Sequence, residues 1–167
     1  MRNALWMLLI TVLASGCIKK IAVNSMADAL SGSTGGSFTQ DDDLQFVGEA
    51  LPFALKTMEA INEQTPDHVG IKETLCSGYT QYSMVYVKWP GDQVRYEDFD
   101  TYEAAMERTK RFLRRSSGYC LAGLDLRHEG FSERIYTDTD ALLAEATEED
   151  VALLYWTGAS WLARISI

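Results

Sequence analysis

Three cysteines carry the most distinctive chemistry in this sequence. Cys17 directly follows three small residues at positions 14–16, which end an apolar run. Small residues fit a peptidase cleft, and a thiol placed just behind them can accept a diacylglycerol group. We therefore expect cleavage before Cys17 and lipidation of its sulfur. An even pair then remains, Cys76 and Cys120, in a chain expected to be exported. Two interpretations of that pair stay open: a disulfide, or two buried thiols that act as small hydrophobic side chains.

Residues 1–16 have the composition of a signal peptide. Arg2 supplies a short positive start, and residues 5–13 form an apolar stretch that is too short to span a bilayer as a mature helix. The sequence LASGC resembles a lipobox, with Ala14 where leucine is commoner. An ordinary signal peptide followed by a chance cysteine is the less favoured alternative. We expect a periplasmic body held only by lipid, at the cell membrane or the outer membrane.

The other candidate ligands and catalytic groups fall into no known pattern. His68 and His128 stand at expected helix ends without a second metal ligand at a suitable spacing. The aspartates at 41–43 lack the glycine and glutamate of an EF-hand loop, so we expect them to cap the next helix. The acidic residues 148–150 suit the first turn of a helix, and the glycines at 32–36 lack the lysine of a phosphate loop. We therefore expect no catalytic, cofactor-binding or metal-binding residue and no enzyme.

The composition limits the classes of partner. The chain has 167 residues and a formal net charge of −9, with 47% hydrophobic and 23% charged residues. The hydrophobic and charged fractions are ordinary for a globular domain. The acidic balance argues against a nucleic-acid partner and against a polybasic grip on anionic lipid.

The elements that must position these residues all have helical spacing. The periodicity predicts an N-terminal anchor region at 17–43, with a short amphipathic helix at 23–30 followed by a Gly/Ser loop, and then a helical domain at 44–167. Strand-like alternation is absent, so we expect an all-α fold. Trp89 to Asp92 contain Pro-Gly and predict a break. Further helices are expected at 44–64, 68–87, 98–127, 138–145 and from 148 onward, the last with Leu154, Gly158, Trp161 and Ile165 on one face.

The spacing of small and apolar residues suggests antiparallel helix pairs of the tetratricopeptide type. Pro66 fits the proline that closes a repeat, and Ala54 then occupies the small position where two helices cross. Glu129 stands where the next closing proline belongs, so a plain helical bundle is the alternative. The apolar, small and aromatic positions around this pattern are Met58, Ile61, Leu75, Cys76, Tyr79, Ser117, Leu121 and Leu124.

Several segments together resemble the T component of TRAP transporters, a family of bacterial periplasmic lipoproteins. The resemblance covers nearly all of the chain after Cys17, and its most specific parts are LPFALK at 51–56 and LLYW at 153–156. Further matching segments are ADALSG at 27–32, GSFTQDDD at 36–43, TPDH at 65–68, CSGYTQY at 76–82, YCLAGL at 119–124 and EDVA at 149–152.

This resemblance implies a tetratricopeptide-like lipoprotein that docks a periplasmic solute-binding protein. It also implies a homotrimer with pores and a small organic or hydrophobic cargo. The chain ends at Ile167, whereas family members continue for several more helices, so we expect a C-terminally short member with an exposed apolar face. The alternative function is a structural tetratricopeptide lipoprotein that organises envelope assembly.

Overall fold

The computed structural model describes residues 21–31 and 40–167, and all regular structure within them is helical. The expected signal peptide, Cys17 and the glycines at 32–36 lie outside these ranges. The prediction of an all-α fold is confirmed. Residues 21–31 form a helix, and the later elements are α2 (Leu44–Gln64), α3 (Val69–Tyr82), the π-helical η1 (Ser83–Lys88), α4 (Trp89–Gln93), α5 (Phe99–Arg127), α6 (Phe131–Thr137), α7 (Thr139–Ala144), the 3₁₀ turn η2 (Glu148–Asp150) and α8 (Val151–Ile165).

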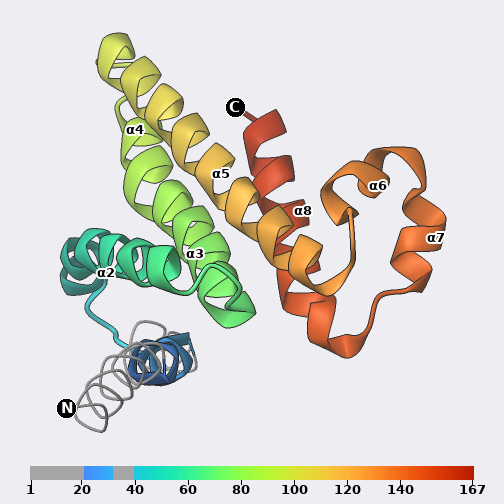
Figure 1. Cartoon of the computed structure of the whole chain (residues 1–167). Helices are drawn as coiled ribbons and strands as arrows, with labels where there is room; N and C mark the ends of the chain where they lie inside the picture. Colours follow the sequence, from blue (N-terminus) through green and yellow to red (C-terminus); the bar gives the residue numbers. More distant parts are fainter. Residues whose placement is uncertain (1–20, 32–39) are drawn as a thin grey trace, which may run out of the picture.

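Consecutive long helices pack as antiparallel pairs. Tyr79 lies opposite Arg115, whereas Tyr82, further along α3, lies opposite Arg108, earlier in α5, so α3 and α5 run in opposite directions. The same ordering holds between α2 and α3 and between α5 and α8. Figure 1 shows α3, α5 and α8 side by side, with α2 across the start of α3 and α6 and α7 projecting from the other side. The tetratricopeptide period itself stays a prediction.

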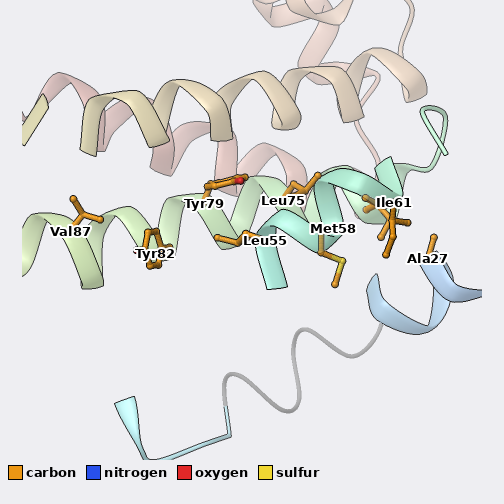
Figure 2. Packing of buried hydrophobic residues seen from close by; sticks show 9 residues of the cluster. Ala27, Leu55, Met58, Ile61, Leu75, Tyr79, Tyr82 and Val87 are labelled. Atoms are coloured by element: carbon orange, nitrogen blue, oxygen red, sulfur yellow. The ribbon is translucent and has the colours of Figure 1, made fainter. Parts of the chain in front are cut away.

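The larger hydrophobic core lies where α2 crosses α3. Leu75 and Ile71 of α3 are fully buried there, and Leu55 and Met58 of α2 pack against them (Figure 2). Ala27 brings the helix at 21–31 into the same core. A second core joins the end of α5 to α6, α7 and α8. It consists of Leu124, Phe131, Leu142 and Leu153.

Side-chain caps begin the helices where the sequence suggested them. The Asp43 carboxylate accepts a hydrogen bond from the Phe46 backbone N–H at 3.0 Å and caps α2. The His68 ring accepts one from the Ile71 N–H at 3.2 Å and caps α3. Thr147 forms a capping box with Asp150 ahead of α8.

The expected break at residues 89–92 is wrong. The chain stays helical through η1 and α4 and leaves the helix only after Gln93. Pro90 falls in the first turn of α4, where its missing N–H is tolerated. Gly91 is buried, and a Cβ placed on it would lie 2.5 Å from the Ala105 Cβ. The glycine therefore allows close packing between α4 and α5 and does not end a helix.

The expectation that Ala54 occupies the tight crossing is also wrong. Ala54 is only half-buried, and the glycine at the α2–α3 crossing is Gly78, where a Cβ would come within 2.7 Å of Leu55 Cδ2. On α8 the buried stripe consists of Leu153, Thr157, Ser160 and Ala163. Of the four residues expected on one face of this helix, Leu154 and Trp161 are half-buried, whereas Gly158 and Ile165 are exposed. The helix α6 was not expected at all.

Candidate ligand groove

A groove lies between α2, α3 and α8 and encloses about 550 Å³. Helix α2 crosses α3 at an angle (Figure 1), and most of the groove lining comes from these two helices, with Trp156 contributed by α8. Sixteen residues line the groove: Ser31, Asp41, Leu44, Val47, Leu51, Ala54, Leu55, Met58, Glu73, Thr74, Ser77, Gly78, Gln81, Val85, Tyr86 and Trp156.

The two helices contribute different chemistry to this groove. The lining from α2 is entirely apolar, from Leu44 to Met58. The lining from α3 includes the carboxylate of Glu73, the amide of Gln81 and the hydroxyl of Ser77. A groove of this size with an apolar wall and a few polar groups suits a small organic molecule that carries a polar end.

A polar seam behind the groove joins α3 to α5. The Thr80 and Ser116 hydroxyl oxygens lie 2.7 Å apart, and Ser116 also donates to the Cys76 carbonyl oxygen at 2.7 Å. Cys76 and Cys120 meet in the same seam, with Cα atoms 5.0 Å apart, and form a disulfide. The two cysteines that the sequence singled out as a pair therefore face each other across the long helices.

A charged cluster ties α2 to the same pair of helices. Tyr119 of α5 donates to Glu59 Oε1 at 3.0 Å, Lys56 pairs with Glu59, and the Arg115 guanidinium lies 3.5 Å from it. Burial acts to raise the pKa of Glu59, but these hydrogen bonds and the positive charge outweigh it, so the pKa lies below its usual value. Burial also raises the pKa of Tyr79 to about 12, so this phenol stays protonated.

Both histidines serve structural roles. His68 Nε2 lies 2.9 Å from Asp28 Oδ1, and His128 Nε2 lies 3.0 Å from the buried Asp150 Oδ2. Burial acts to raise the pKa of Asp150, but hydrogen bonds from Thr147 and His128 hold it below its usual value. Within residues 21–31 and 40–167, no group of His, Cys, Asp or Glu is arranged to hold a metal ion.

Comparison with known proteins identifies the family. None of the described helices combines the length and the apolarity that a membrane span requires. The family model of the TRAP transporter T-component matches residues 40–167. This chain belongs to the T-component family. It is also similar to an uncharacterized protein of Treponema pallidum (strain Nichols), with 26% identity over 174 residues that cover 93% of this chain and 54% of that protein. The chain thus spans about half the length of the curated relative it matches.

Membership of the T-component family confirms the resemblance drawn from the sequence. Several of the residues that line the groove stand in the segments that carried the resemblance, including Leu51, Ala54 and Trp156. The groove itself was not predicted, because α2 and α8 reach it from sequence positions about a hundred residues apart.

Proposed function

We propose that this T-component is a lipid-anchored periplasmic accessory protein that docks the solute-binding protein of its transporter. We further propose that the groove receives a small organic or hydrophobic solute at that encounter. The observation that carries the proposal is a groove of about 550 Å³ in a member of a transporter family. The family match favours this role over that of an envelope scaffold and over that of an enzyme.

The lining chemistry supports an amphiphilic solute. Burying the apolar part of a ligand against Leu51 and Val47 would stabilise the complex by roughly 25 cal/mol per Å² of apolar surface removed from water. A polar end would face Glu73 and Gln81 and so fix the orientation.

The anchor and the assembly belong to the same proposal. Lipidation at Cys17 would hold the body at a membrane, and export would place it in the periplasm. A homotrimer has a candidate surface in the outer stripe of α8, where large apolar residues lie in solvent at heptad spacing. These residues are Val151, Tyr155, Leu162 and Ile165, which are 59%, 63%, 71% and 82% exposed.

The test is direct binding of the purified lipoprotein, in detergent micelles, to the solute-binding protein of the same transporter. We expect a complex by analytical ultracentrifugation. Extracted solute should be identified by mass spectrometry of protein purified from its native membrane.

Groove variants test the ligand separately. Leu51→Lys places a charge in the apolar wall and should abolish solute recovery while the partner complex still forms. Phe53→Lys introduces the same charge on the same helix, at a side chain that is 78% exposed and outside the groove, and is the matched control. Equal solute recovery from Leu51→Lys and the unaltered protein would refute the groove as the ligand site.

A further inference from the structure

A short stretch of α5 concentrates positive charge in an otherwise acidic chain. Five of the 15 lysines and arginines stand at positions 108–115, whereas the chain as a whole has a net charge of −9. The stretch itself contains no carboxylate and is preceded by Glu107, and its arginines are exposed. We call Arg108, Lys110, Arg111, Arg114 and Arg115 the basic ridge.

Three of the five ridge side chains form no close ion pair within the described residues, although the exposed Glu107 attracts Arg111 and Arg114 electrostatically. Elsewhere Lys88 pairs with Asp92, Arg127 with Glu149 and Arg134 with Glu145. Within the ridge, Lys110 and Arg115 reach a carboxylate. In the part of the chain that the structure describes, Arg108, Arg111 and Arg114 make no ion pair.

Two of the ridge arginines are held in place by aromatic rings. The Arg108 guanidinium lies 5.3 Å from the centroid of the Phe112 ring, and the Arg115 guanidinium lies 5.3 Å from that of Tyr79. The Tyr79 and Phe112 rings stack on each other at 5.8 Å. A guanidinium fixed in this way loses little conformational freedom when it binds a carboxylate, and aromatic-supported arginine is typical of protein interface hot spots.

The position of the ridge favours a protein over a lipid surface. The contact between Asp28 and His68 places the helix at 21–31 against the start of α3. The start of α3 in turn lies beside the C-terminal end of α5. The ridge lies toward the other, N-terminal end of α5. Its members precede Cys120 by five to twelve residues, which places them roughly 8 to 18 Å from Cys120 along the helix axis, at 1.5 Å per residue. The ridge therefore lies away from the end of α5 beside which the described helix at 21–31 meets α3.

We propose that the basic ridge is the docking surface for an acidic face of the solute-binding protein. This inference rests on the proposed function, because it assigns the surface through which that partner binds. Unpaired arginines on the T-component would meet carboxylates on the partner, which steers association and fixes the orientation of the complex.

The test compares two triple variants of the full lipoprotein, in detergent micelles, for binding to the solute-binding protein of the same transporter. The ridge variant carries Arg108→Glu, Arg111→Glu and Arg114→Glu. The control variant carries the same change of charge at Lys88→Glu, Arg95→Glu and Arg134→Glu. We expect the ridge variant to raise Kd by roughly tenfold or more and to flatten the salt dependence, and the control to change Kd by less than about twofold.

Each other outcome is decisive. Equal weakening by both variants, or by neither, would overturn the ridge as the docking surface while leaving the proposed function standing. Absence of binding by the unaltered protein would refute the proposed function and this inference together. Binding to vesicles of phosphatidylcholine and phosphatidylglycerol that the ridge variant alone loses, with partner binding unchanged, would assign the ridge to a lipid surface and overturn the proposal. If circular dichroism shows that the ridge variant is unfolded, the double variant Arg111→Glu and Arg114→Glu replaces it, because it keeps Arg108 on the Phe112 ring.

Discussion

At the scale of single residues, Glu59 of α2 joins two helices that are far apart in the sequence, because its carboxylate contacts side chains of α5. It is 9% exposed and accepts from Tyr119, sixty positions away, while Lys56 and Arg115 balance its charge. Removing the Glu59 carboxylate is costly because the partly buried Tyr119 hydroxyl then loses its acceptor.

We expect Glu59→Gln to lower the free energy of unfolding by about 1–3 kcal/mol at pH 7. The folded state holds the pKa of Glu59 below its usual value, so the ionised carboxylate stabilises the fold above about pH 4.3 and that stabilisation is lost as the pH falls through the lowered pKa. The difference between the two proteins should therefore shrink between about pH 5 and pH 3 in urea titrations. Glu63→Gln, at an exposed position of the same helix, is the control, and a pH-independent difference would contradict this assignment.

Capping residues could be predicted from the sequence, whereas the charged cluster could not. Asp43 and His68 act on N–H groups three residues away, so the local sequence contains both partners. Glu59 and Tyr119 meet only because α2 and α5 both contact α3, and a single sequence gives no sign of that meeting. The same reason hid the groove, whose apolar wall and rim come from α2 and α8.

At the scale of helices, the glycines divide into two groups that the sequence cannot tell apart. Gly91 faces the Ala105 Cβ, which cannot rotate away, whereas Gly118 has open space around it. The sequence rule that Pro-Gly breaks a helix therefore failed at residues 89–92, where packing against α5 decides the conformation.

We expect Gly91→Ala to lower the free energy of unfolding by about 1–3 kcal/mol, because its new methyl group would overpack the contact between α4 and α5. Gly118→Ala in the exposed middle of α5 should instead raise it by about 0.5–1 kcal/mol, through helix propensity alone. Thermal denaturation of the two variants measures both signs. A stabilised Gly91→Ala protein would show that α4 and α5 are packed less closely at Gly91 than they are in the structure.

The disulfide between Cys76 and Cys120 adds a covalent bond to the packing of the two long helices α3 and α5. It joins α3 to α5 across a sequence separation of 44. We expect replacement of both cysteines by alanine to lower the free energy of unfolding by about 2–4 kcal/mol. Reductant should destabilise the unaltered protein by a similar amount and leave the double variant unchanged. Detection of two free thiols in the denatured, unreduced protein after export would contradict the bond.

At the scale of the whole molecule, the outer stripe of α8 leaves large apolar side chains in solvent. Its members Leu162 and Ile165 are 71% and 82% exposed. Trp161, by contrast, stacks on Tyr136 of α6 at 5.8 Å and belongs to the packed side of the helix.

We expect the unlipidated protein to self-associate through this stripe, because burying apolar surface on a second copy removes it from water. Leu162→Glu with Ile165→Glu should shift its sedimentation coefficient toward that of a monomer. Phe53→Glu, at a position of α2 that is 78% exposed, should leave it unchanged. A monomeric unaltered protein at micromolar concentration would exclude this surface as the one that builds a trimer.

The seam between α3 and α5 also limits how the molecule can move. The disulfide and the hydrogen-bonded hydroxyls of Thr80 and Ser116 tie these helices together at two points one helical turn apart, so neither helix can slide along the other. Sliding of packed helices is one of the common ways in which proteins open a binding site, and the long helices here are barred from it. Any widening of the groove would therefore involve movement of α2 or α8 rather than a shift of α3 against α5. Hydrogen exchange should accordingly be slowest in the amides around Cys76 and Cys120 and faster in α2.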